Sequence, residues 1–266
     1  MNAPAPAPAS YPDRPAAEAP PDAAAASARD AGIVTGIAAE GRVLLRALPA
    51  RWQSISHDGL EARLVCAGAD SERARAGAER LLSEGATALV SFGIAGGLDP
   101  VLRPGALLLP EAVLTPARGE IAADAAWRQR VAEGFRQGGG ACASGLLLGS
   151  ATVIADQAAK AAQFRATGAS AVDMESHAVA EVARRAGVPL LVVRAIADPA
   201  DRALPAIVLG SIGANGEPRG GLVAGRLALR PWQLPDLLRL RQDARQALMA
   251  LAALARAVGP ALLGRL

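Results

Sequence analysis

Short apolar runs alternate with amphipathic segments along residues 31–200. The runs AGIVT, ALVSF and LLVVRAIA have the length and the valine content of buried strands. Segments such as SERARAGAERLLS and HAVAEVARRAG repeat apolar residues at helical spacing, and the second ends in two arginines and Gly187, a typical helix C-terminus. This alternation predicts βα units around a largely parallel or mixed sheet.

The two ends of the chain depart from this pattern. Residues 1–30 are rich in alanine and proline, and we expect a disordered tail there. The domain then covers residues 31–266. Within it, residues 203–235 form an inserted glycine- and leucine-rich basic segment, and residues 236–258 have the spacing of a long amphipathic helix. No apolar run reaches the roughly 18–20 residues that a membrane-spanning helix needs.

Composition and charge exclude several classes of protein. With 52% hydrophobic and 3% aromatic residues, the chain can bury one large core of alanine, valine and leucine. A net charge of +3 and the lack of a basic recognition helix argue against nucleic-acid binding. Two cysteines and two histidines, none at metal-ligand spacing, indicate a cytoplasmic protein without a disulfide framework or a structural metal.

The positive charge is concentrated near the C-terminus. From Arg202 onward, nine arginines face three acidic residues. Such a basic, leucine-rich region can contact anionic lipid or an acidic partner. A solvated helix face is the commoner explanation of the same pattern.

Three acidic residues each follow a predicted strand: Glu40, Glu175 and Asp198. Because ligands in open α/β sheets bind at the carboxyl ends of the strands, the sheet can bring these carboxyl groups to one pocket. The last two also have structural explanations. Asp198, followed by Pro199, could cap a helix, and Glu175 could be an ordinary acid in the first turn of one.

Carboxyl groups in different surroundings suit the cleavage of a glycosidic bond. Positive charge develops on the sugar in the transition state, and the leaving group needs a proton. A desolvated carboxyl group with a raised pKa can supply that proton, while others stabilise the sugar cation or activate the nucleophile.

A glycine-rich segment, SFGIAGGLDP at residues 91–100, is predicted to form a turn after a strand. Its glycines would let backbone N–H groups approach a ligand closely. The segment lacks the GK[ST] ending of a P-loop and does not match GxGxxG in the context of a dinucleotide fold. A sharp structural turn explains it equally well.

The segments GIVTGIAAE, SFGIAGGLDP, SATVIAD, AVDMES and VVRAIAD, in this order, resemble the purine nucleoside phosphorylase and nucleosidase superfamily. Over about residues 31–200 the chain looks like the methylthioadenosine/S-adenosylhomocysteine nucleosidases. As a whole it is similar to the hopanoid-associated phosphorylases, which act on adenosylhopane. The resemblance implies a single-domain three-layer α/β/α sandwich with a central mixed sheet, no cofactor, and a homodimer.

The resemblance also implies roles for the acidic residues. Asp198 matches the aspartate that protonates or hydrogen-bonds N7 of adenine, so that neutral adenine leaves. Glu175 matches the glutamate that binds the ribose hydroxyls, with Met174 against the sugar. Glu40 matches the glutamate that activates water in the nucleosidases.

Further residues are implied to line the substrate site. Val153 and Ile154 fall where the family holds the purine, and Gly93 and Ile94 belong to the glycine-rich segment. Two departures concern phosphate. Ile94 replaces a serine that is usual in the family, and Ser91 stands where the hexameric phosphorylases have a phosphate-binding arginine. Both changes remove polar ligands for phosphate.

Hydrolysis is therefore slightly favoured over phosphorolysis, in which inorganic phosphate would be the co-substrate. Glu40 repels a nearby dianion and is suited to hold water. Phosphorolysis stays open, since Arg42, Arg103, Arg118 or Arg202 could complete a phosphate site.

We thus expect cleavage of the N-glycosidic bond of an adenine nucleoside, with adenosylhopane as the preferred substrate. A polycyclic lipid on the ribose 5′ carbon would need an apolar channel and a membrane surface, for which residues 203–258 are the candidates. One alternative is a methylthioadenosine/S-adenosylhomocysteine nucleosidase. Another is a non-catalytic nucleoside- or lipid-binding module, although binding alone has no need of a proton donor.

Overall fold

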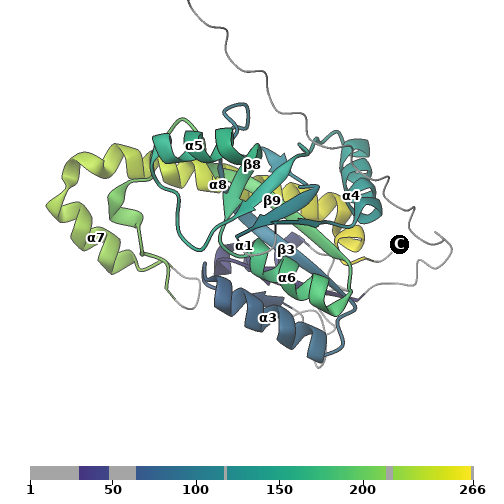
Figure 1. Ribbon diagram of the computed structural model, residues 1–266. Helices are drawn as coiled ribbons and strands as arrows, with labels where there is room; N and C mark the ends of the chain where they lie inside the picture. The colour runs from purple at the N-terminus through teal and green to yellow at the C-terminus, as the bar shows by residue number, and fades with distance from the viewer. Residues whose placement is uncertain (1–29, 48–63, 117–118, 214–217, 265–266) are drawn as a thin grey trace, which may run out of the picture.

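A mixed sheet forms the centre of the molecule (Figure 1). The computed structural model describes residues 30–47, 64–116, 119–213 and 218–264, and nine strands of these residues make up the sheet. The strand order is β2-β1-β3-β8-β7-β5-β6, with β9 paired to β3 and β4. The strands are β1 (Ala31–Thr35), β2 (Leu64–Cys66), β3 (Ala88–Gly97), β4 (Leu107–Leu108), β5 (Ala112–Thr115), β6 (Gly119–Ala122), β7 (Leu146–Gly149), β8 (Ala169–Asp173) and β9 (Leu190–Asp198).

Helices cover both faces of this sheet. One apolar cluster lies between the sheet and α3 and α6, and a second lies between the opposite face and α1, α4 and α8. The predicted α/β fold with helices on both sides of a mixed sheet is therefore confirmed. The helices are α1 (Ala38–Ala47), α3 (Ser71–Ser83), α4 (Ala125–Gln137), α5 (Gln157–Thr167), α6 (Ser176–Ala186), α7 (Gly220–Leu229) and α8 (Leu234–Leu262).

The glycine-rich segment belongs to the central strand β3. Backbone pairing with β9 continues through Gly93 and Ile94, and the last residues, Gly96 and Gly97, pair antiparallel with β8. The glycines do not form the predicted turn, because strand partners on both sides keep this backbone extended. The turn follows them at residues 99–102, where the N–H of Leu102 donates to the carbonyl oxygen of Asp99. Glycines within a strand often mark a place where another group approaches the backbone closely.

The ends of β8 and β9 lie along this second half of β3, and β1 ends beside the middle of the strand. β1 and β9 run parallel to β3, as the sequence predicts, whereas β8 runs antiparallel to it. Asp173, the last residue of β8, nevertheless lies beside the glycine-rich half, because β8 pairs there through Val172 and Gly96. The carboxyl ends of parallel strands therefore bring only some of the predicted acids together, and the antiparallel pairing of β8 with β3 also contributes.

The C-terminal region contains an external helical hairpin. Residues 203–235 include the short helices η2 (Ala206–Val208) and η3 (Pro231–Gln233), and α7 between them buries none of its side chains. Figure 1 shows α7 and the start of α8 projecting from one side of the sheet.

The later part of α8 packs on the domain through Ala247, Leu251 and Leu254. No helix in the described ranges is long and apolar enough to cross a membrane. The predicted tail at residues 1–30 lies, except for Asp30, outside the described residues.

Candidate active site

Glu40 lies in the first turn of α1 and is 2% exposed. Its Oε2 accepts hydrogen bonds from the N–H groups of Gly36, at 2.8 Å, and Ile37, at 2.9 Å. Its Oε1 accepts one from the N–H of Ile94 at 2.8 Å. Burial raises the pKa of Glu40, and these backbone donors and the charge of Arg194 only partly offset it. The amide of Ile94 is thus engaged by a carboxylate.

Glu175 follows β8 and stands at the N-cap position of α6. It therefore precedes the first turn of α6, where a helix acid was the alternative explanation; its side chain makes no capping hydrogen bond and is 8% exposed. Burial raises the pKa of Glu175 to about 8, with a further contribution from the neighbouring Asp173. Arg194, whose Nη2 lies 4.0 Å from Glu175 Oε2, opposes this rise.

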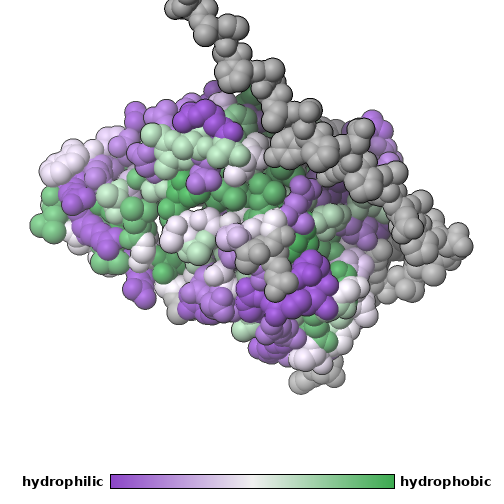
Figure 2. Space-filling view, viewed as in Figure 1, coloured by the Kyte–Doolittle hydropathy of each residue, from purple (hydrophilic) through white to green (hydrophobic). Residues whose placement is uncertain are grey.

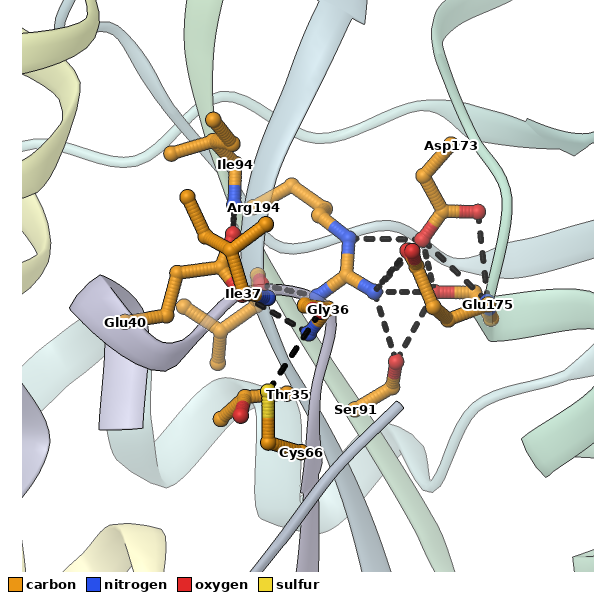
Figure 3. A network of polar contacts seen from close by, with 12 residues as sticks. Thr35, Gly36, Ile37, Glu40, Cys66, Ser91, Ile94, Asp173, Glu175 and Arg194 are labelled. Carbon is orange, nitrogen blue, oxygen red and sulfur yellow. Dashed lines mark hydrogen bonds and ion pairs between the residues drawn. The ribbon is translucent and has the colours of Figure 1, made fainter. Parts of the chain in front are cut away.

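Arg194 and Asp173 form a buried ion pair behind these two glutamates. Arg194 Nε donates to Asp173 Oδ2 at 2.7 Å, and Nη2 donates to the hydroxyls of Ser91, at 2.6 Å, and Ser176, at 2.8 Å. In Figure 3 the guanidinium lies between Glu40 and Glu175. Arg194 and Asp173 were not among the predicted site residues, although charged residues inside apolar strand segments are a signal of such a pair.

Asp198 ends β9 directly after an irregularity in its pairing with β3. Ile196 pairs with Ala95 but Asp198 pairs with Gly96, so β9 has one extra residue, Ala197. A bulge of this kind redirects the next side chain. No helix begins after Asp198, because residues 199–202 form a turn, and the helix-capping explanation is wrong.

Lys160 on α5 is the ionic partner of Asp198. The two side chains form a short ion pair, with Lys160 fully buried and Asp198 14% exposed. Burial raises the pKa of Asp198, although the charge and hydrogen bond of Lys160 act in the opposite direction. Lys160 was not among the predicted site residues, and its partner is 38 residues away in the sequence.

Each predicted acid faces a glycine. A Cβ atom on Gly93 would lie 2.7 Å from the carboxyl group of Glu40, and one on Gly36 would lie 2.8 Å from Glu175 Oε1. A Cβ on Gly96 would lie 3.2 Å from Asp198 Oδ1. The glycines therefore make room for the carboxyl groups.

The residues implied to hold the purine lie near the end of β7. Ile154 lines a cavity of about 360 Å³ with Leu148, Gly149 and Thr115, while Val153 is 49% exposed. The three acids do not line this cavity. Met174 is half-buried between Asp173 and Glu175.

Two of the arginines considered for phosphate are paired with carboxylates. Arg103 Nη1 lies 2.8 Å from Asp201 Oδ2, and Arg202 pairs with Asp243 on α8. Arg42 is exposed on α1, and Arg118 lies outside the described residues. Within the part of the chain that the structure describes, no group of His, Cys, Asp and Glu side chains could hold a metal ion.

A sequence model of one enzyme family matches residues 54–210, more than half of the chain. The chain belongs to the Phosphorylase superfamily. The prediction of an enzyme with nucleosidase or nucleoside phosphorylase activity agrees with this membership. The comparison with curated proteins gives no match.

Solved structures share the fold of this Phosphorylase superfamily member at low identity. Native futalosine hydrolase of Helicobacter pylori strain 26695 has a TM-score of 0.60 and 17% identity, over 86% of this chain and 97% of that chain. The S-adenosylhomocysteine nucleosidase of Streptococcus pyogenes has a TM-score of 0.61 and 17% identity, over 86% and 97%. The 5′-methylthioadenosine/S-adenosylhomocysteine nucleosidase from Neisseria meningitidis has a TM-score of 0.59 and 17% identity, over 85% of this chain and 99% of that chain.

Proposed function

We propose that the protein hydrolyses the N-glycosidic bond of an adenine nucleoside. The observation that carries this proposal is the position of three buried acids: Glu40 and Asp198 border Gly93 and Gly96 of β3, and Glu175 lies against Gly36, close enough for the charge of Glu40 to act on it. Their surroundings differ, since backbone amides hold Glu40, a buried ion pair borders Glu175, and a lysine pairs with Asp198. Such differences allow one carboxyl group to act as an acid while another acts as a base.

Each acid has a separate task in the proposed reaction. Asp198 donates a proton to N7 of adenine, so that the electrons of the C1′–N9 bond leave with a neutral base. Glu175 accepts hydrogen bonds from the ribose hydroxyls, with Met174 beside the sugar. Glu40 accepts a proton from the water that attacks C1′, and its three backbone donors fix its orientation.

Adenine as the base is supported by family membership and by the relatives of known structure. Two of these are nucleosidases for S-adenosylhomocysteine or 5′-methylthioadenosine. Val153 and Ile154 are proposed to contact the purine. Gly93 and Ile94 are proposed to line the site next to the sugar.

Water is favoured over phosphate as the nucleophile because the buried cations are already paired with carboxylates. Among the described residues, Lys160 and Arg194 are the buried cations, and each is already hydrogen-bonded to a carboxylate. Ser91, also buried, bonds Arg194 and Ser176. A phosphate dianion near Glu40 would thus meet a carboxylate without a spare buried cation to offset the repulsion.

The test is chromatography of the products from adenosylhopane and from 5′-methylthioadenosine, each with and without inorganic phosphate. We expect adenine and the free sugar at a rate that does not depend on phosphate. If a ribose 1-phosphate product forms, and only when phosphate is present, hydrolysis is contradicted but cleavage of the N-glycosidic bond still holds. Adenine binding without adenine release would instead favour a non-catalytic module.

We propose adenosylhopane as the preferred substrate because of the hairpin formed by α7, η3 and the start of α8. Leu229 is 78% exposed, Trp232 70% and Leu238 53%. Figure 2 shows apolar and hydrophilic residues side by side on this hairpin. A cavity of about 350 Å³ between η2 and α7 is lined by apolar residues together with Arg226 and Arg230. Exposed leucine and tryptophan beside arginine suit contact with an anionic bilayer surface, from which a lipid-linked nucleoside would come.

Replacing both Leu229 and Trp232 with serine is expected to lower kcat/KM at least ~10-fold for adenosylhopane in anionic vesicles, because apolar area that would enter the bilayer is lost. Hydrolysis of 5′-methylthioadenosine should not change. Val101→Ser is the control, since Val101 is also 78% exposed but lies outside the hairpin. Equal turnover of the lipid nucleoside by the double variant and by wild type would remove the hairpin from substrate delivery.

The homodimer implied by the family resemblance also remains a proposal. Light scattering of the purified protein measures it directly. A mass equal to that of one chain would contradict it.

A further inference from the structure

Lys160 is the only lysine in the chain, and its side chain is completely buried. Its Nζ donates to Asp198 Oδ2, to the carbonyl oxygen of Pro199 at 3.0 Å and to that of Arg202 at 3.0 Å. Lysine is almost never fully buried without a charged partner. All three ammonium hydrogens are thus directed at the end of β9 and the turn that follows it.

These three bonds accommodate either of two proton positions. With an ammonium and a carboxylate, Lys160 donates three hydrogen bonds. With an amine and a carboxylic acid, Lys160 still donates to both carbonyls and accepts one bond from the Asp198 hydroxyl. The proton can therefore move between Nζ and Oδ2 without leaving a buried donor or acceptor unpaired.

Lys160 bonds only one of the two oxygens of Asp198, Oδ2. Both oxygens border the glycine-rich half of β3, since a Cβ on Gly96 would lie 3.2 Å from Oδ1 and 3.3 Å from Oδ2. Within the described ranges no protein donor bonds to Oδ1, so this oxygen is left for a ligand in the proposed site.

We propose that Lys160 is a positioning residue that supplies, through Asp198, the proton taken up by the departing base. This inference rests on the proposed function, since it assumes that Asp198 faces N7 of a purine. It makes Lys160 and Asp198 a single proton-donating pair.

The proton balance closes over one turnover. As the C1′–N9 bond breaks, its electrons go to N9, Asp198 gives a proton to N7, and Asp198 takes one from Lys160, which becomes an amine. Water adds to C1′ and gives one proton to Glu40. Glu40 then releases that proton to solvent. Asp198, which is 14% exposed, takes one up and passes it to Lys160, so nucleoside and water become adenine and free sugar.

Other charged groups around the pair do not share this arrangement. Asp243 on α8 and Arg202 in the turn act on Asp198 in opposite directions through their charges, and they pair with each other. Lys160 alone provides both a charge and a transferable proton, because a guanidinium does not release its proton.

The test is the pH dependence of kcat/KM for adenine release in Lys160→Met and Lys160→Arg, with the soluble 5′-methylthioadenosine and with adenosylhopane. In wild type the two groups hold the transferred proton together. In Lys160→Met, Asp198 has to retain its proton without help from a second group. We therefore expect the loss of activity at high pH to begin at least ~2 pH units lower than in wild type. Near pH 5, the activity of Lys160→Met should stay within ~10-fold of wild type. In Lys160→Arg the fixed charge keeps Asp198 ionised, and the fall should move lower still.

A purely structural role for Lys160 predicts different results. Loss of the turn would reduce activity by the same factor at every pH, and a need for positive charge alone would give Lys160→Arg the wild-type profile. Either outcome would overturn the proposal. Asp201→Asn is the matched control, because it removes the exposed ion pair to Arg103 in the same turn and should leave the pH profile unchanged. Thermal unfolding of each variant checks that it is folded.

A second measurement needs no Lys160 variant and no activity. Protein labelled with ¹⁵N in lysine has one side-chain Nζ signal, which reports whether Lys160 is an ammonium or an amine. We expect an ammonium in the free enzyme at neutral pH, with a titration that changes in Asp198→Asn. An amine throughout pH 5–9, or identical titrations in the two proteins, would overturn the proton pair. Absence of adenine release from both nucleosides, with this NMR result intact, would instead contradict the proposed function.

Discussion

Replacing Asp198 with asparagine is expected to lower the rate of adenine release by about 10³-fold, because an amide cannot transfer a proton to the leaving base. The substitution should also destabilise the protein. Lys160 is fully buried, and loss of its partner leaves an uncompensated charge that costs about 3 kcal/mol. From the sequence alone, the Asp198→Asn variant would be expected to fold normally, because the sequence does not show that Asp198 pairs with Lys160. The measurements are adenine release at saturating nucleoside and chemical denaturation.

The double variant Lys160→Met, Asp198→Asn separates these two effects. Without the buried charge it should recover most of the lost stability, while adenine release stays as low as in the single variant. Near-normal turnover by Asp198→Asn would remove Asp198 from the mechanism. Recovery of activity together with stability would show that the single variant had failed only through misfolding.

Replacing Glu175 with glutamine is expected to stabilise the protein above neutral pH and to abolish most of its activity. Burial raises the pKa of Glu175 from 4.5 to about 8, so the folded state binds this proton more tightly than the unfolded state does. The wild-type protein therefore loses stability as the pH rises from about 4.5 through 8. A glutamine does not titrate, so the gain in the free energy of unfolding should be near zero at about pH 4. It should reach a few kcal/mol at about pH 9, because a tenfold change in proton affinity corresponds to roughly 1.4 kcal/mol.

Activity should fall most above about pH 8, where the wild-type Glu175 is a carboxylate, because a neutral amide stabilises the developing sugar cation less than a carboxylate does. Glu181→Gln on the same helix is the control. Glu181 Oε2 lies 3.0 Å from Arg75 Nη2 on α3, far from the proposed reaction, so its loss should cost stability and leave kcat unchanged. A stability difference between Glu175→Gln and wild type that is the same at pH 4 and pH 9 would contradict the assigned pKa.

The sequence predicted the acids but not the groups that hold them. Glu40, Glu175 and Asp198 could be found because each follows an apolar run, and strand ends in an α/β sheet are places where ligands bind. The partners of Lys160 and Arg194 could not be predicted, because these contacts join residues 38 and 103 positions apart. Such pairings exist only once the sheet and α5 are assembled.

The misassigned turn shows a different limit. Glycines in SFGIAGG have the local signature of a turn, yet pairing with β9 and β8 keeps them in β3. Local composition indicated flexibility, whereas tertiary pairing decided the conformation. The sequence led us to expect a ligand close to these glycines; in the structure, side-chain carboxylates of the protein lie close to them.

Gly36, Gly93 and Gly96 also set how this enzyme can be altered. At the first two, any larger residue would place an atom less than 3.0 Å from a carboxyl oxygen, and at Gly96 the space is only slightly greater. Random mutagenesis should therefore return few active variants at these positions. Libraries aimed at a different nucleoside should keep all three glycines and vary Val153 and Ile154, where partial exposure gives new side chains room.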